Sequence, residues 1–446
     1  MESKTENSVE ASSSNNDRWP SFLSHPIAIA ISAILFVCLA SATGFRIHKE
    51  YASAEMTEFD WTLRGHSDFH NGIYLPSQAF IAGVNPFSKD AVEQYLMTRA
   101  CPPYSPVTFM LHSPFALFNV YAADVLFYLY NLGLALLLGY CGITMSGGRF
   151  RWFAFFALGC LVLISRPGHI TLFTGYFTLE LVLGTIVALH FAKTKPMLSG
   201  LGMLLASSKP TYIVPLVFMM MWRKNYKATI IGCILCGVFA AGGIAWLSYH
   251  SSLDSVIAGI QQGQDDHIED VTEYPINTWT RIDLLGMFAK TINWNPATKI
   301  YLIAMFFLMI IPGLAVARAT HLESNTGGCG LTAWIVVLSM LVCLYHHSYD
   351  CLLLVAPWIG VTFFGRQTLP ELGSFARRTI ALLTAIPAGN YLSTQTARDR
   401  LGFEQLDIGW QAITMINGTC LLIALAILIY HAFKLPKQAI GASPSE

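Results

Sequence analysis

Long apolar runs separated by short polar connections make up most of the chain. The runs lie near residues 25–45, 105–145, 151–165, 174–192, 197–207, 210–222, 228–248, 299–318, 331–347, 349–365, 377–395 and 412–433. A helix needs roughly 20 apolar residues to cross about 30 Å of hydrocarbon. The pattern therefore predicts an all-α, polytopic integral membrane protein with about 12 transmembrane helices. The two short runs that flank Lys209 are also compatible with one interrupted helix.

The composition excludes the common soluble classes. Hydrophobic residues make up 54% of the chain and charged residues 12%, whereas a soluble domain carries roughly 25% charged residues. The 27 basic and 27 acidic residues cancel, which removes any general case for nucleic-acid binding. Most cysteines lie in apolar runs, so no disulfide framework is implied. Gly200 and Gly202 also lie in an apolar run and are expected to serve close helix packing.

The distribution of Lys and Arg predicts the orientation in the membrane. Basic clusters occur at residues 149–151, 193–195, 223–227, 366–378 and 434–437. With the N-terminus inside and about 12 spans, all of these clusters fall on one face, and short basic loops stay on the cytoplasmic side. The polar residues that could carry chemistry, which lie in the other connections, are therefore expected on the opposite, external face.

The chain divides accordingly into a membrane domain and two tails. Residues 1–24 are polar and rich in Ser and Asn, which predicts a disordered cytoplasmic tail. Residues 25–435 form the transmembrane domain, and residues 436–446 form a cytoplasmic C-terminal tail. Two long external loops, 46–104 and 248–298, hold most of the candidate chemistry.

The first external loop carries two candidate general bases, Asp60 and Asp68, among imidazoles and aromatic residues. A carboxylate near the interface accepts a proton from a substrate hydroxyl when it is held near that hydroxyl and is partly desolvated. The alternative is that both are solvated loop residues. His66, two residues before Asp68, is a candidate substrate-binding residue. Residues 74–81 are expected to form a short amphipathic helix along the membrane surface.

Cations at the ends of the apolar runs indicate a bound phosphate. Arg166 and His169 stand where a run ends externally, and Tyr176 follows shortly afterwards. Lys209 lies between two apolar runs, opposite the basic clusters, where a cation is costly and usually has a functional partner. We predict these four residues as substrate-binding, with a lipid phosphate as the ligand. The alternative for Arg166 is that its side chain only extends to the lipid headgroups and does not bind a substrate.

The polar segment from Tyr345 to Asp350 interrupts two further apolar runs. Adjacent histidines point in different directions, and zinc-binding spacing is missing, so no metal site is expected. One histidine, His346 or His347, oriented by Asp350, is expected to act at a phosphate or leaving oxygen. Tyr345 and Tyr349 are candidate substrate contacts. The structural alternative is an interfacial cap of aromatic and polar residues.

The second external loop gives weaker signals. Its acidic stretch at residues 265–273 is typical of a solvated face. Residues 277–281 are candidates to line an acceptor groove, in which Trp279 offers a sugar a stacking surface. No nucleotide-binding motif occurs, so soluble nucleotides are not expected as substrates.

Several short motifs together resemble one known family. They are Asp68-Phe69, Tyr74, Gln78-Ala79, Gly83-Val84-Asn85-Pro86-Phe87, Cys101-Pro102-Pro103-Tyr104-Ser105-Pro106, Ser113-Pro114, Lys209-Pro210 and His346-His347-Ser348-Tyr349-Asp350, spread over about residues 25–435. The pattern resembles the GT-C-type glycosyltransferases of family 87, the bacterial polyprenyl-phosphate-mannose-dependent mannosyltransferases. Two details differ: the stretch from Asp68 to Gly83 is about one residue longer, and Gly175-Tyr176 stands where the family commonly has Gly-Gln.

The resemblance implies a GT-C-like helical bundle in the bacterial inner (plasma) membrane, with its active site on the external, periplasmic side. It implies transfer of a hexose, mannose by analogy, from a polyprenyl-phosphate donor to a lipid or glycan acceptor. Asp68 would be the general base, and His346 or His347 would assist at the donor phosphate, with neither a metal nor another cofactor. In-line attack by the activated hydroxyl inverts the anomeric centre.

The competing class is transport by a polytopic lipid or solute carrier, or flippase. In that interpretation Lys209, Arg166 and Asp350 would line a pathway through the membrane. The long aromatic first loop favours the enzyme, because carriers place their key groups at mid-membrane on broken helices.

Overall fold

The computed structural model describes residues 25–52, 64–98, 104–269, 274–294, 298–322, 327–404 and 407–436. Asp60, the tail 1–24 and most of the tail 436–446 lie outside these ranges.

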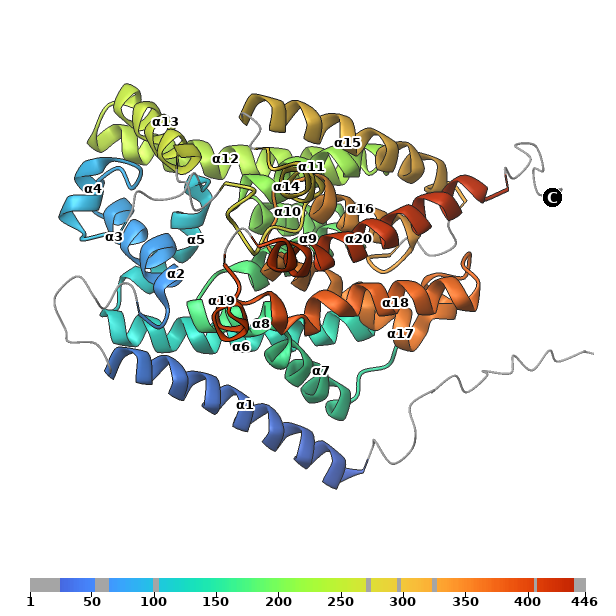
Figure 1. The fold of residues 1–446 in the computed structure, drawn as a ribbon. Coiled ribbons are helices and arrows are strands. Elements are labelled where there is room, and N and C mark those ends of the chain that lie inside the picture. The colour runs from blue at the N-terminus through green and yellow to red at the C-terminus, as the bar shows by residue number, and fades with distance from the viewer. Residues whose placement is uncertain are drawn as a thin grey trace, which may run out of the picture.

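The described residues fold into helices joined by short connections (Figure 1). The α-helices are α1 (Pro26–Ala52), α2 (Ser67–Phe69), α3 (Leu75–Ile81), α4 (Lys89–Gln94), α5 (Pro106–Ala116), α6 (Val120–Met145), α7 (Trp152–Ile164), α8 (Arg166–Thr174), α9 (Thr178–Phe191), α10 (Pro196–Ala206), α11 (Pro210–Trp222), α12 (Tyr226–His250), α13 (Leu253–Glu269), α14 (Leu284–Ile292), α15 (Thr298–Ala319), α16 (Leu331–Cys343), α17 (Val355–Thr368), α18 (Ser374–Gly389), α19 (Gln395–Leu401) and α20 (Ile408–Lys434). Three further turns are π-helical η3 (His70–Tyr74) and the 3-10 turns η5 (Ser348–Leu354) and η6 (Tyr391–Ser393).

Local sequence signals account for several helix starts. Proline is the first residue of α5, α10 and α11, where its fixed φ suits a helix and its missing N–H costs nothing. The Asn119 side chain accepts a hydrogen bond from the Ala122 N–H at 3.0 Å and caps α6. The predicted run 105–145 is therefore two helices, α5 and α6, separated by this cap.

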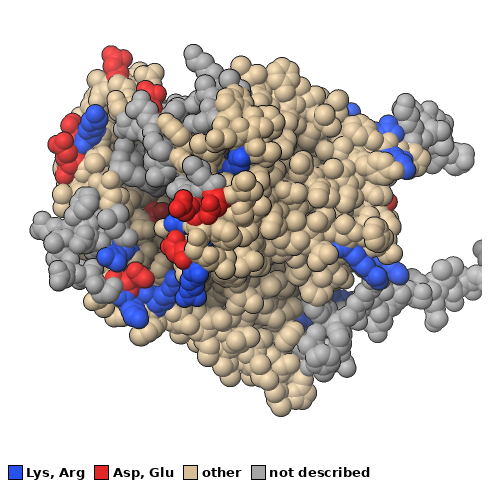
Figure 2. Space-filling view, viewed as in Figure 1, with Lys and Arg blue, Asp and Glu red and all other residues tan. Residues whose placement is uncertain are grey.

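The helices of the loops gather at one end of the bundle. In Figure 1, α2, α3, α4, α5 and α13 lie at the left, where α1 ends, while α20 ends at the right. Figure 2 shows charged side chains over the left part of the visible face and at its right-hand edge, with a broad uncharged region between them. Uncharged surface between two charged ends is the distribution that a bilayer requires.

Helix lengths support membrane insertion but do not confirm the predicted number of spans. Within the described residues, five helical stretches are long and apolar enough to cross a membrane, namely α1, α6, α12, Ser348–Thr368 and α20. Helices α7 and α8 would form a sixth span together, although they bend by 76° at their junction. Five more apolar stretches, of 10–17 residues, are shorter than a straight crossing requires. The number of about 12 stays a prediction.

The predicted glycine packing is confirmed between α9, α10 and α12. A Cβ at Gly202 would lie 2.5 Å from the Gly184 carbonyl oxygen, and one at Gly200 would lie 2.7 Å from the Ile231 side chain. Only glycine permits these backbones to approach so closely.

The predicted surface helix near residues 74–81 is wrong in its location. Leu75, Pro76, Ser77, Ala79 and Phe80 are buried in the protein, because α3 packs on α5 instead of lying open to the membrane surface. The preceding η3 is π-helical, and a π-helical turn holds one residue more than an α-helical turn.

Candidate active site

Asp350 lies at the centre of a buried polar cluster. It belongs to η5, and its carboxylate accepts hydrogen bonds from the Tyr212 hydroxyl at 2.7 Å, the His346 Nδ1–H at 2.9 Å and the His347 backbone N–H at 3.0 Å. The Lys209 ammonium lies 3.5 Å from the same carboxylate. Residues far apart in the chain therefore meet at one carboxylate.

The Lys209 ammonium is enclosed by aromatic rings. Its nitrogen lies 5.4 Å from the ring centre of Tyr176, 5.6 Å from that of Tyr212 and 5.3 Å from that of Tyr349. The side chain is 8% exposed, and within the described residues the ammonium makes the ion pair with Asp350 but no hydrogen bond. A desolvated ammonium with unused donors attracts an anion strongly.

Tyr104 joins this aromatic enclosure through Tyr176. Their hydroxyl oxygens are 2.9 Å apart. Burial, and then the neighbouring Tyr104, raise the pKa of Tyr176 well above its usual value. The phenol therefore stays protonated at neutral pH.

The two adjacent histidines differ in their contacts. The His347 Nδ1 lies 2.5 Å from the Thr280 hydroxyl, and its Nε2 lies 2.6 Å from the Tyr345 hydroxyl. The His346 Nδ1 faces Asp350, while its Nε2 is buried and has no hydrogen-bond partner among the described residues. His346 is therefore the histidine whose outer nitrogen remains for a ligand.

This difference predicts unequal effects of substitution. His346→Gln is expected to lower activity about 100-fold, because it removes the buried ring nitrogen that has no hydrogen-bond partner among the described residues. His347→Gln is expected to lower the melting temperature and to cost less than about tenfold in activity, because His347 bonds to its own protein on both sides. Activity assays and thermal unfolding of the two purified variants would test this. Equal activity losses in the two variants would contradict the assignment of His346 as the histidine that is left for a ligand.

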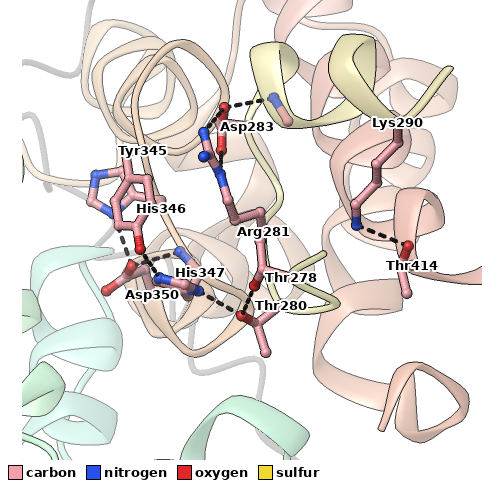
Figure 3. A network of polar contacts seen from close by, with 11 residues as sticks. Thr278, Thr280, Arg281, Asp283, Lys290, Tyr345, His346, His347, Asp350 and Thr414 are labelled. Atoms are coloured by element: carbon pink, nitrogen blue, oxygen red, sulfur yellow. Dashed lines mark hydrogen bonds and ion pairs between the residues drawn. The ribbon is translucent and has the colours of Figure 1, made fainter. Parts of the chain in front are cut away.

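Residues 280–283, from the 248–298 loop, lie beside this cluster and bond to it (Figure 3). Arg281 and His347 form an antiparallel bridge, with the Ile282 N–H bonded to the His346 carbonyl at 3.1 Å. The Arg281 guanidinium donates two hydrogen bonds of 2.8 Å to the Asp283 carboxylate. The sequence had suggested an acceptor groove for residues 277–281, whereas the structure shows Thr280 and Arg281 in contact with His347 and Tyr345.

Lys290, on α14 beside this segment, donates a hydrogen bond of 3.0 Å to the Thr414 hydroxyl (Figure 3). Burial, and then the nearby Arg281, lower the pKa of Lys290 to about 7, although Asp283 opposes the shift. The folded state therefore binds fewer protons here than the unfolded state between pH 7 and about 10.5.

The melting temperature of the purified protein is expected to rise as the pH increases from 7 to 9. In this range folding releases the proton that the unfolded chain holds at Lys290, and this release costs less free energy as the pH rises. Lys290→Met should flatten this rise and raise the melting temperature at pH 7. A variant with an unchanged pH dependence would show that Lys290 does not cause it.

Asp68 lies in the short helix α2 at the edge of the aromatic enclosure. It is half-buried and interacts electrostatically with Tyr349. The α2 turn packs tightly against Gly175, whose φ of +72° is in the left-handed region; a Cβ there would lie 2.7 Å from the Phe69 Cβ. Because Tyr176 follows directly, this contact joins the Asp68 turn to the surroundings of Lys209.

His66 makes a different contact from the one predicted. Its Nδ1 lies 3.2 Å from the Asp124 carboxylate on α6, and the His70 Nε2 lies 2.9 Å from the same oxygen. The Tyr51 hydroxyl donates to the other Asp124 oxygen at 2.9 Å. The sequence reasoning missed Asp124, although a single acid inside an apolar run was the signal for it.

Arg166 and His169 lie on α8 in different surroundings. Arg166 is 3% exposed, donates from Nη2 to the Ser393 carbonyl at 2.9 Å, and has no hydrogen-bond partner at Nε or Nη1 among the described residues. It interacts electrostatically with Cys351, the neighbour of Asp350. His169 instead contacts Arg46 of α1, at 2.9 Å.

The structure thus brings most of the predicted site residues together. Seven of them form the cluster around Lys209 and Asp350, Asp68 lies at its edge, and Arg166 lies beside η5; the seven are Tyr176, Lys209, Tyr345, His346, His347, Tyr349 and Asp350. His66 contacts Asp124 and His169 contacts Arg46, so their assignment to the substrate stays a prediction. No three His, Cys, Asp or Glu side chains in the described ranges are arranged to hold a metal ion.

Comparisons with known proteins bear on the chemistry of this cluster. The sequence profile of glycosyltransferase family 87 matches residues 103–344, more than half of the chain. The matched segment contains Arg166, Tyr176 and Lys209, while Asp68 precedes it and His346 follows it. No curated protein and no solved structure matches the chain. Because the family profile covers more than half of the chain, including much of the helical bundle, the chain belongs to glycosyltransferase family 87.

Proposed function

We propose that this membrane glycosyltransferase moves mannose from a polyprenyl-phosphate donor to a hydroxyl of a lipid or glycan acceptor. The observation that carries the proposal is the meeting of the buried Lys209 ammonium and the His346 ring at Asp350, with the His346 Nε2 buried and without a hydrogen-bond partner among the described residues, next to the turn that bears Asp68. Cationic and carboxylate groups on two sides of one site are what a displacement from a phosphate requires.

On the donor side, Lys209 and His346 bind the phosphate of the lipid-linked sugar. The departing polyprenyl phosphate gains negative charge as the glycosidic bond breaks, and nearby donors in a desolvated site stabilise that charge. Asp350 accepts the hydrogen bond from the His346 Nδ1 and so holds the ring in one orientation, and a proton on Nε2 lets this nitrogen donate to the phosphate. Arg166, beside η5, adds positive charge from the other side. This step needs no metal ion or other cofactor.

On the acceptor side, Asp68 accepts the proton of the attacking hydroxyl. The hydroxyl oxygen then forms the new bond to the anomeric carbon as the bond to the phosphate breaks. One displacement from the side opposite to the leaving group inverts the anomeric centre. Tyr176 and Tyr349, whose rings lie beside the Lys209 ammonium, contact the sugar.

The proposed location is a bacterial inner membrane with the site on its external face. The loop helices α2 to α5 and α13 lie at one end of the bundle (Figure 1), and the basic clusters of the sequence predict that the other end is cytoplasmic. A donor with a polyprenyl tail stays in the membrane and reaches this site by lateral diffusion. Nucleic acid is not an expected partner.

Membranes that contain the protein would test the donor class. Radiolabelled polyprenyl-phosphate mannose, polyprenyl-phosphate glucose and nucleotide-activated mannose would be supplied separately, with and without EDTA, and labelled products would be identified. We expect transfer from polyprenyl-phosphate mannose that EDTA does not affect. Preferred use of the nucleotide sugar would contradict the proposal. The same assay distinguishes an enzyme from a carrier, because a carrier moves its ligand without breaking the bond.

A further inference from the structure

The turn that bears Asp68 is held in place by a second buried carboxylate, that of Asp124, which contacts the two histidines on either side of Asp68 in the sequence. His66 Nδ1 and His70 Nε2 lie 3.2 and 2.9 Å from one oxygen of Asp124. The Tyr51 hydroxyl donates to the other oxygen at 2.9 Å and accepts a hydrogen bond from the His66 backbone N–H at 3.2 Å. We call His66, His70, Asp124 and Tyr51 the clamp. It joins α1 and α6 to the first external loop.

The hydrogen bonds to Asp124 can all form with both imidazoles neutral. Each ring then donates one N–H to Asp124, and the Tyr51 hydroxyl supplies a third donor. His66 Nε2 is buried without a hydrogen-bond partner among the described residues, which fits an unprotonated nitrogen. Loss of the carboxylate would remove the acceptor of the His66 ring and of the Tyr51 hydroxyl, and would leave His70 Nε2 with the Tyr51 hydroxyl, 3.2 Å away, which is costly.

The spacing of the clamp places Asp68 on the other side of the turn. His66 and His70 are four residues apart and so share one face of a helical turn, whereas Asp68, midway between them, lies on the opposite face. Asp68 lies in the first turn of a helical stretch that continues through η3 and α3, and the first turn of a helix has unpaired backbone N–H groups and frays most readily. The position of Asp68 therefore depends on contacts with the rest of the protein.

Two contacts complete the support of the turn. The Phe69 ring stacks on Phe127 with their centres 4.3 Å apart, and Gly175 leaves no space for movement towards Tyr176. Phe127 and Asp124 both lie on α6, so one helix holds the turn through an aromatic contact and through the clamp. Movement of the turn away from the site would require that the clamp opens.

We propose that the four clamp residues are positioning residues that set the location of the Asp68 carboxylate at the acceptor hydroxyl. The inference rests on the proposed role of Asp68. In this role the clamp acts on the rate of the chemical step and not on donor binding. A base displaced by about 1 Å loses on the order of 100-fold in rate.

Asp124→Asn is the first test, made on the full-length protein in detergent or liposomes. We expect kcat to fall roughly 10- to 100-fold, with the KM for the lipid-linked donor within about twofold of wild type. Tyr51→Phe removes one donor of three and is expected to lower kcat less, in the same direction. This milder variant keeps the proposal testable if Asp124→Asn does not fold.

The chain offers a matched control in a second buried imidazole–carboxylate pair. His112 Nε2 lies 3.2 Å from a Glu180 oxygen that also accepts the Tyr130 hydroxyl at 2.9 Å. Glu180→Gln disturbs the same chemistry at similar burial, and its partners His112 and Tyr130 reach the Asp68 turn only through aromatic contacts such as that with Phe127. It is expected to lower the melting temperature while kcat stays within about threefold of wild type. Equal kcat losses in Glu180→Gln and Asp124→Asn would overturn the proposal.

A double-mutant cycle separates positioning from general damage. In an Asp68→Asn background, Asp124→Asn is expected to cause no further loss of the residual transfer, because the position of an absent base no longer matters. Multiplicative losses, or a raised donor KM with unchanged kcat, would overturn the role of the clamp. If Asp68→Asn alone retains full activity, the proposed base is wrong, and that result is distinct from a failure of the clamp.

Discussion

Asp68→Asn is expected to reduce transfer by about 100- to 10,000-fold, the range that a general base contributes. The amide has nearly the shape of the carboxylate but does not accept the proton of the acceptor hydroxyl. Donor binding should be nearly unchanged, because the phosphate contacts come from Lys209 and His346. The measurement compares kcat and donor KM of the purified variant with those of wild type in one assay.

Asp90→Asn is the matched control for this prediction. Asp90 is an exposed residue of α4 in the same external loop, so the variant makes an identical chemical change outside the site. It should retain wild-type activity. An Asp68→Asn protein as active as Asp90→Asn would show that the base lies elsewhere, and Asp60 would then be the next candidate.

Lys209→Met is expected to abolish measurable transfer and to weaken donor binding strongly. The variant removes the buried ammonium to which we assign the leaving phosphate. It also leaves Asp350 without its cation, and removal of one partner of a buried ion pair costs roughly 3–5 kcal/mol of stability. Donor-binding measurements and thermal unfolding would report the two effects separately.

A paired variant separates function from stability at this position. Lys209→Met combined with Asp350→Asn removes both charges together, so it should regain much of the lost melting temperature. Its transfer activity should stay absent, because no cation has been restored at the phosphate. Recovery of activity along with stability would mean that Lys209 acts only through folding.

The sequence predicted the membrane class because the signal is carried by composition and long apolar runs. It could not predict every helix boundary, because a run such as 105–145 contains a cap at Asn119 that hydropathy does not detect. The location of α3 was wrong for a similar reason. Its amphipathic pattern is equally suited to a membrane surface and to the protein contact with α5 that the structure shows.

The site was predicted where charged or polar residues interrupt apolar runs. Lys209 and Asp350 are such residues, and they meet in the structure although they are far apart in the chain. What the sequence could not give is the choice of partners. The Thr280 and Tyr345 hydroxyls bond to the two ring nitrogens of His347, so only His346 keeps a ring nitrogen for a ligand. Likewise Asp124 holds His66, a contact set by helix packing alone.

The central claim is that a lipid-linked sugar phosphate binds between the buried cations and Asp68. An experimental structure of the Asp68→Asn protein in a bilayer mimic with polyprenyl-phosphate mannose bound would test it most directly. The account predicts the phosphate within hydrogen-bond distance of Lys209 and the His346 Nε2, with the anomeric carbon facing residue 68. A phosphate bound away from Lys209, or a sugar turned away from residue 68, would contradict it.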